Sequence, residues 1–205
     1  MRKLLFFTTI LLLGFTACSR EDITTEFPDD VTNGIVINGV RWATRNVDTP
    51  GTFTNSPEAF GRHFQWNIRQ GFAINDDAAD WKYSNFTGTE WYAENDPCPS
   101  GWRVPTVIEF QSLLNANSRW VTTREGITGR LFGNAPNQIF LPAVGIRFPE
   151  VTWLGSSGFY WSNTQHSREY SDEFAMSFVF GDDIVYIRSD LQFAGFPIRC
   201  VTINK

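Results

Sequence analysis

The sequence has few of the residues on which metal and hydrolytic chemistry depend. It holds only two histidines, His63 and His166, and neither belongs to an HExxH pair or a Cys/His grid. Because a zinc site needs three or four such ligands, a zinc centre is not expected. The chain also lacks a Gly-x-Ser-x-Gly elbow and an acidic run with EF-hand spacing. We therefore assign no catalytic residue, no metal ligand and no cofactor from the sequence.

Clusters of positive charge and long apolar runs are also missing. The 205 residues include 17 Lys and Arg against 22 Asp and Glu, a formal net charge of −5. Without a basic patch the chain has no electrostatic footprint for a nucleic acid. Its longest apolar stretch, residues 4–15, is shorter than the ~20 residues that a membrane span requires. Neither a nucleic-acid partner nor a transmembrane helix is expected.

That apolar stretch has instead the organisation of an export signal. Two basic residues precede it, and two small residues connect it to Cys18. Residues 15–18, Phe-Thr-Ala-Cys, resemble a bacterial lipobox, although Phe15 departs from the usual Leu or Val. The resemblance implies a signal peptide at residues 1–17 and lipidation of Cys18. The alternative is an ordinary secretory signal followed by an incidental cysteine.

The residues after Cys18 refine the predicted location. The acidic stretch Ser19-Arg20-Glu21-Asp22 resembles the surface-export signal of Bacteroidetes lipoproteins. It implies an outer-membrane lipoprotein that faces the medium and holds the membrane through its lipid. The alternative is a solvated tether, because charged segments poor in apolar residues tend to be disordered. Residues 18–34 are accordingly predicted to be a lipidated tether, and residues 35–205 a single domain.

Local patterns in the domain predict a mostly antiparallel sheet with one or two helices. Asn38-Gly39 between two apolar runs predicts a β-hairpin, and Gly181-Asp182-Asp183 predicts a second hairpin over residues 174–189. Further strands are expected over residues 119–123, 139–141, 159–161 and 197–203. This arrangement belongs to the α+β class.

Two segments carry helix-start signals. Thr106 with Glu109 three residues later forms a capping box for a helix over residues 107–115. Ser56 as N-cap with Pro57 at the first helical position predicts a second, short helix.

Residues 98–106, Cys-Pro-Ser-Gly-Trp-Arg-Val-Pro-Thr, resemble the signature of the FISUMP (Fibrobacter succinogenes major paralogous) domain. Segments 39–47, 61–67, 141–147, 158–163 and 195–201 resemble further family motifs in the same order. The resemblance spans about residues 36–203 and implies a secreted or lipid-anchored envelope protein. A more distant likeness to C-type-lectin-like domains, which include the formylglycine-generating enzymes, implies a fold of that type. The lectin triplets that bind calcium and sugar are absent.

The cysteines fit this picture. If Cys18 is lipidated, Cys98 and Cys200 remain as a pair in an oxidising compartment, which predicts one disulfide. Lectin-like domains join their first and last cysteines in the same way. The alternative is a catalytic or copper-binding thiol pair, as in the formylglycine-generating enzymes.

The aromatic residues supply the candidate ligand contacts. Four tryptophans lie in strand patterns and family motifs and are assigned to the core: Trp42, Trp66, Trp102 and Trp161. Four rings lie in polar loops, where they could stack on a sugar: Trp81, Trp91, Tyr92 and Trp153. For each loop ring the alternative is packing beneath its own loop.

These observations favour a lipid-anchored, non-enzymatic recognition module for an extracellular glycan or protein. Two alternatives stay open, an accessory structural subunit of a surface assembly and an envelope glycan hydrolase. A hydrolase would need two carboxyl groups across a cleft.

Overall fold

The computed structural model describes residues 22–23, 27–77, 79–83, 90–166 and 173–203. Cys18 and the predicted signal peptide lie outside these ranges. Within them, no helix combines the length and the apolar character needed to cross a membrane.

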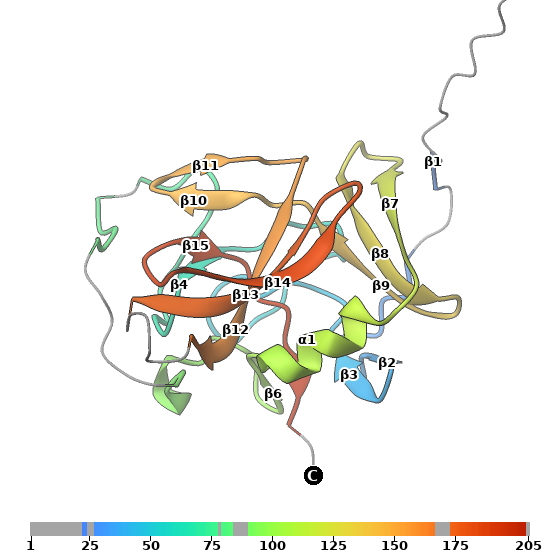
Figure 1. The fold of residues 1–205 in the computed structure, drawn as a ribbon, viewed down its shortest axis with the longest axis horizontal. Helices are drawn as coiled ribbons and strands as arrows, with labels where there is room; N and C mark the ends of the chain where they lie inside the picture. The colour runs from blue at the N-terminus through green and yellow to red at the C-terminus, as the bar shows by residue number, and fades with distance from the viewer. Residues whose placement is uncertain (1–21, 24–26, 78, 84–89, 167–172, 204–205) are drawn as a thin grey trace, which may run out of the picture.

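The described strands form four small sheets around a single α-helix (Figure 1). One sheet has the order β1 (Asp22–Ile23), β7 (Ser118–Thr123), β8 (Thr128–Asn134), β9 (Asn137–Pro142). The second is β11 (Glu150–Thr152), β10 (Ile146–Phe148), β15 (Gly195–Phe196), β4 (His63–Gln65), β5 (Gly71–Phe72). The third is β12 (Gly158–Gln165), β13 (Phe174–Phe180), β14 (Val185–Leu191). The fourth is β2 (Ile35–Ile37), β3 (Val40–Trp42), β16 (Val201–Thr202), β6 (Trp102–Arg103).

Among these strands every pairing is antiparallel except that of β1 with β7. A short 3₁₀ helix, η1, covers Ala93–Asn95, and the α-helix α1 covers Val107–Leu114. The predicted α+β class with a mostly antiparallel sheet is therefore confirmed, whereas the likeness to C-type lectins stays a prediction.

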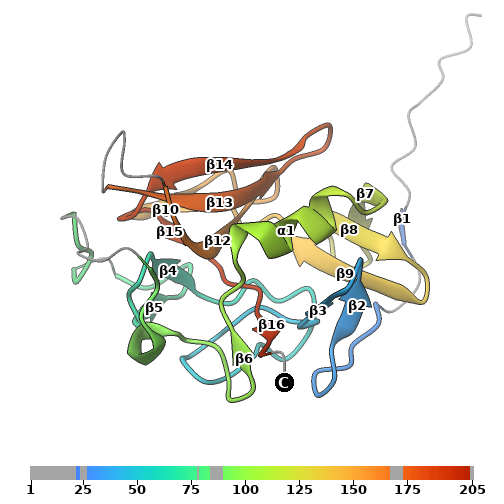
Figure 2. The ribbon, with the colours of Figure 1, turned by 60° about the horizontal axis from the view of Figure 1, so that its bottom comes forward.

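The first hairpin forms as its turn residues predict. Asn38 and Gly39 have φ values of 46° and 84°, the pair of positive angles that defines a type I′ turn. The turn aligns Ile37 with Val40 and Ile35 with Trp42 in β2 and β3. Figure 2 shows this hairpin beside β9.

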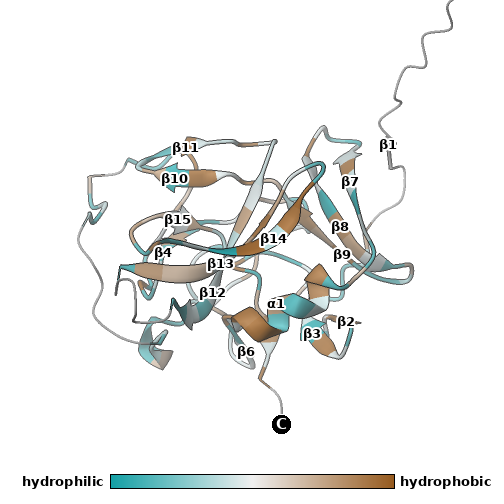
Figure 3. Cartoon of the chain, viewed as in Figure 1, coloured by the Kyte–Doolittle hydropathy of each residue, from teal (hydrophilic) through white to brown (hydrophobic). Residues whose placement is uncertain are grey.

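Helix α1 begins at the predicted capping box. The Thr106 hydroxyl accepts a hydrogen bond from the Glu109 N–H at 3.1 Å, and the Glu109 carboxylate accepts one from the Thr106 N–H at 2.8 Å. Apolar and hydrophilic residues alternate along α1 (Figure 3), and Phe110 and Leu113 are buried whereas Ile108 is exposed. Phe110 stacks on Phe178 of β13 with ring centroids 4.8 Å apart and also contacts Trp42 of β3. The helix thereby covers one face of the third sheet.

The third sheet is buried on both faces. Along β13, Phe178 and Phe180 contribute to the core cluster beneath α1, while Ala175 and Val179 face a second cluster built around Trp66 and the last strands. The strict alternation of this strand determines which side chains enter which cluster. The four tryptophans assigned to the core from the sequence are all buried in these two clusters: Trp42, Trp66, Trp102 and Trp161.

The predicted disulfide is present. Cys98 and Cys200 are joined with an S–S distance of 2.05 Å and Cα atoms 6.1 Å apart. The bridge links the segment before β6 to the segment before β16, and these two strands also pair directly. The C-terminal strand is thereby held to the middle of the chain in the fourth sheet.

Two expectations about local structure are wrong. Ser56-Pro57 opens no helix, because the segment makes only one turn, closed by a 3.3 Å bond from Ala59 N–H to the Ser56 carbonyl. A single turn fixes several dihedral angles for one hydrogen bond, so it does not propagate without further support.

The second correction concerns the predicted tether. Residues 27–34 belong to the fold, since Phe27 is buried and stacks on Phe140 with ring centroids 4.5 Å apart. Asp29 nearby accepts hydrogen bonds from Thr44 and Arg45. Tertiary contacts therefore order a segment whose composition alone is typical of a linker.

Candidate functional site

Two of the four candidate ligand-binding rings are buried. Trp81 is 5 % exposed, packs on Phe72 at 5.2 Å between ring centroids and lies beneath the Arg147 guanidinium. Trp91 is 8 % exposed, meets Trp66 edge to face and donates its ring N–H to the Asn95 carbonyl. Neither ring has a face free to stack on a ligand. Both pack within the fold, which is the alternative to ligand contact.

The other two rings reach the surface at separate places. Tyr92 is 38 % exposed at the start of η1, and its backbone N–H donates to Asn67 Oδ1 at 2.8 Å. Trp153 is 57 % exposed and stacks on Phe159, with its backbone at a φ of 58°. A positive φ is unusual for a bulky residue. The Trp153 carbonyl is held by bonds from the Ser156 N–H and hydroxyl. A role in binding stays a prediction for both residues.

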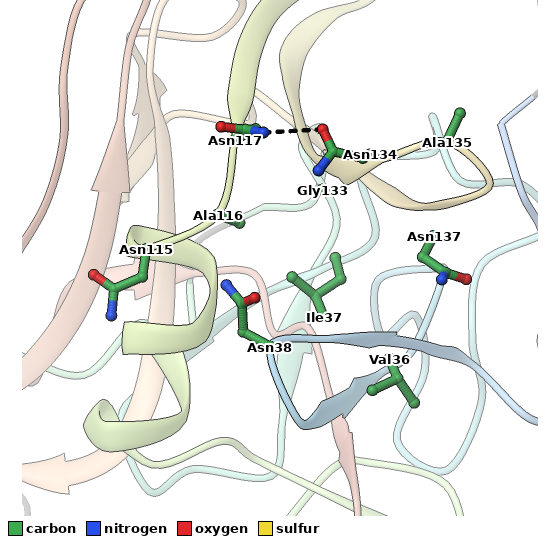
Figure 4. A pocket seen from close by; sticks show the side chains of 10 residues that line it. All are labelled: Val36, Ile37, Asn38, Asn115, Ala116, Asn117, Gly133, Asn134, Ala135 and Asn137. Atoms are coloured by element: carbon green, nitrogen blue, oxygen red, sulfur yellow. Dashed lines mark hydrogen bonds between the residues drawn. The ribbon is translucent and has the colours of Figure 1, made fainter.

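The structure brings together a different set of polar residues. A cleft of about 360 Å³ lies between the β2–β3 turn, the end of α1 and the β8–β9 turn. Five asparagines line it together with small and aliphatic residues: Asn38, Asn115, Asn117, Asn134 and Asn137, with Val36, Ile37, Ala116, Gly133 and Ala135. We call it the asparagine cleft. Figure 4 shows Ile37 between Asn38 and Asn137, with Asn117 and Asn134 across the opening.

Each asparagine is positioned by a local turn. Asn38 adopts the left-handed conformation of the type I′ turn, which Asn tolerates better than other side chains. Asn115 is the C-cap of α1, and the chain passes through Asn117 into β7. Asn134 and Asn137 face each other across a two-residue turn that contains the cis Ala135–Pro136 bond. Turn chemistry therefore explains why asparagine gathers at this end of the molecule.

The carboxamides keep unused hydrogen-bonding capacity. Asn38 Nδ2 donates to the Ser112 carbonyl at 2.9 Å, and Asn117 Nδ2 donates to Asn134 Oδ1 at 3.1 Å. These bonds leave Asn38 Oδ1, Asn117 Oδ1 and the Asn134 amide group facing solvent. The Asn115 and Asn137 side chains make no hydrogen bond within the described part of the chain. The cleft can thus offer donors and acceptors at the same time.

The cleft carries no charge, because its lining contains no titratable side chain. Its floor is rigid: Ile37 is 4 % exposed, and Gly133 N–H donates to the Asn117 carbonyl at 2.8 Å. A Cβ at Gly133 would lie 2.3 Å from the Asn137 carbonyl oxygen, so only glycine permits this close approach. The arrangement suits a neutral ligand rich in hydroxyl groups.

A second cleft, of about 410 Å³, has acidic residues in its lining, in contrast to the uncharged asparagine cleft. Phe27, Asp29 and Glu125 line it together with the turn of residues 56–58. The Arg45 guanidinium donates to the Asp29 carboxylate, and this hydrogen bond lowers the pKa of Asp29 below its ordinary value. Within the described residues, no group of three His, Cys, Asp or Glu side chains is placed to hold a metal ion.

Sequence reasoning did not find the asparagine cleft. Its residues come from three turns distant in the chain, at 38, 115–117 and 134–137. In sequence, asparagine at such places is typical of turns. The one available signal is the occurrence of two closely spaced asparagine pairs, Asn115-Ala-Asn117 and Asn134-Ala-Pro-Asn137, and it does not show that the pairs meet.

Comparison of the chain with protein-family models, curated proteins and solved structures finds no match in any of the three. The resemblance to FISUMP and C-type-lectin-like domains therefore stays a prediction.

Proposed function

We propose that this protein is a lipid-anchored envelope protein that binds an extracellular glycan in the asparagine cleft without chemically changing it. One observation carries the proposal: five asparagines line the cleft, their carboxamides keep unused donors and acceptors, and no titratable residue joins them. Sugar hydroxyls both donate and accept hydrogen bonds, and a carboxamide matches them on both counts.

The neutrality of the cleft argues for this ligand class over others. A phosphate or a nucleotide would need a compensating positive charge or a row of backbone N–H groups. An apolar ligand would leave the carboxamides unpaired, which costs free energy. A polyhydroxylated ligand satisfies them, and the exposed Val36 side chain offers contact to its C–H groups.

The expected affinity is modest. Each neutral hydrogen bond contributes a net ~0.5–1.5 kcal/mol, so about four such bonds would supply roughly 2–6 kcal/mol before the cost of association. A dissociation constant of roughly a millimolar corresponds to ~4 kcal/mol. Many lipid-anchored copies on one surface would raise the effective affinity for a polymeric glycan, because later contacts become intramolecular. The lipobox-like residues 15–18 and the acidic stretch after Cys18 support this location.

A glycan array probed with the purified full-length protein in detergent tests the proposal. Asn137→Ala removes an exposed carboxamide without a partner in the described chain, so we expect several-fold weaker binding and an unchanged melting temperature. Asn75→Ala is the matched control, because Asn75 is also exposed in a turn but lies outside the cleft.

Two results would contradict the proposal. A blank array, together with a protein crosslinked to the cleft on intact cells, would favour the accessory subunit of a surface assembly. Shortened oligosaccharides after incubation, detected by mass spectrometry, would favour the envelope hydrolase.

A further inference from the structure

The asparagine cleft does not end at Asn117 and Asn134. A second hollow of about 130 Å³ shares Asn117, Gly133 and Asn134 with it and adds Ser118, Arg119 and Leu131. The two hollows are neighbours, and together their lining extends from the β2–β3 turn to the start of β7; we call the pair the groove. Arg119 is the one charged residue in the lining of this groove.

Arg119 differs from most arginines in the described chain. Arg45, Arg103 and Arg188 each bind a carboxylate. Arg62 lies between two carboxylates, those of Asp48 and Asp76. Five more arginines donate hydrogen bonds to backbone carbonyls: Arg41, Arg69, Arg130, Arg147 and Arg199. Within the described residues, Arg119 and Arg124 make no such contact.

The position of Arg119 is determined by the β7–β8 register. Arg119 pairs with Leu131, so its side chain shares a face with that residue, whereas Ser118 pairs with Phe132 on the other face. The Ser118 hydroxyl accepts a hydrogen bond from Arg130 Nε at 3.0 Å rather than from Arg119. An unpaired guanidinium thus lies at one end of a groove whose remaining lining is neutral.

We propose that the glycan is acidic, with its anionic group on Arg119 and a neighbouring neutral sugar in the asparagine cleft. This inference rests on the proposed function. A guanidinium binds a carboxylate through two parallel N–H···O bonds, which gives direction as well as attraction. The formal net charge of −5 repels an anionic chain at long range, whereas the guanidinium of Arg119 attracts it locally.

The test compares three probes on the full-length protein in detergent by calorimetry or biolayer interferometry. They are a uronic-acid tetrasaccharide, the same tetrasaccharide after reduction of its carboxyl groups, and a tetrasaccharide without carboxyl groups whose one charged group is a sulfate ester. We expect about tenfold tighter binding of the uronic-acid probe than of its reduced form at low salt, and a smaller difference at high salt. Tight binding of the sulfated probe alone would contradict a carboxylate ligand.

Substitution isolates the guanidinium. Arg119→Gln should bring the acidic and the reduced probe to equal affinity while the reduced probe binds as before. Arg124→Gln is the matched control, because it removes the same charge from the β7–β8 turn and should keep the preference. Loss of the preference in both variants would overturn the inference, since it would indicate only the overall field of the protein.

Different results would contradict the role of Arg119 and the binding of a glycan. Equal binding of acidic and reduced probes by the wild type would overturn the role of Arg119 and leave glycan binding intact. Absence of binding to every probe, in an array and in solution, would overturn both.

Discussion

His63 provides a sharp test of the electrostatics of the fold. It lies in β4 with no exposed surface, and its Nε2 is 3.3 Å from the Val144 carbonyl oxygen, while its Nδ1 has no partner among the described residues. The close packing comes from Gly195, where a Cβ would lie 3.2 Å from that of His63. Burial, with a smaller contribution from the Arg147 charge, lowers the pKa of His63 from 6.5 to about 4.

The sign of the effect on stability follows from proton linkage. As the pH falls below 6.5, His63 becomes protonated in the unfolded chain, whereas in the folded chain it stays neutral until the pH reaches about 4. The stability associated with neutral His63 is therefore complete above pH 6.5 and is lost between pH 6.5 and about 4. A difference of about 2.5 pKa units corresponds to roughly 3 kcal/mol.

Urea denaturation from pH 7.5 to pH 4 measures this loss. The wild type should lose roughly 3 kcal/mol more across that range than His63→Gln or His63→Phe, neither of which can take up the proton. Carboxyl groups contribute equally to all three proteins, so the difference between the curves isolates residue 63. Parallel curves for wild type and variants would refute the reasoning, and an imidazole titrating near pH 6.5 by NMR would show where it fails.

Three further perturbations test the fold. Replacing Cys98 and Cys200 by Ser opens a span of 102 residues, and chain entropy predicts a loss of about 4.7 kcal/mol; an unchanged urea midpoint would contradict a stabilising bridge. Thr106→Ala removes the N-cap of α1 and should cost ~1 kcal/mol in thermal unfolding, whereas Thr106→Ser should cost little. Phe27→Ala should lower the free energy of unfolding by ~3 kcal/mol, because it removes the ring that stacks on Phe140. A change near zero would indicate that residues 27–34 contribute nothing to the fold and act as a tether.

Local features of the sequence were enough to predict several elements. Asn38-Gly39 needs no distant partner to favour a type I′ turn, and Thr106 with Glu109 caps a helix through bonds three residues apart. The alternation over residues 174–180 likewise predicts a strand with two distinct faces. The disulfide followed from the cysteine count together with the predicted export to an oxidising compartment.

Burial and convergence depended on tertiary structure. The sequence shows Trp81 and Trp91 as aromatic residues in polar loops, and only their contacts with Phe72 and Trp66 place them inside. The segment around Ser56 has good helix-start residues but makes a single turn.

The asparagine cleft shows the same division most clearly. Its composition follows from the sequence, because each asparagine suits the turn that it occupies. Its existence does not, because nothing local relates the turn at residue 38 to those at 115–117 and 134–137. The sheet register and the docking of α1 bring the three together, and these depend on packing between residues far apart in the chain. The sequence by itself thus determined the turns and the chemical type of their residues, and only the tertiary structure decided that they share one site.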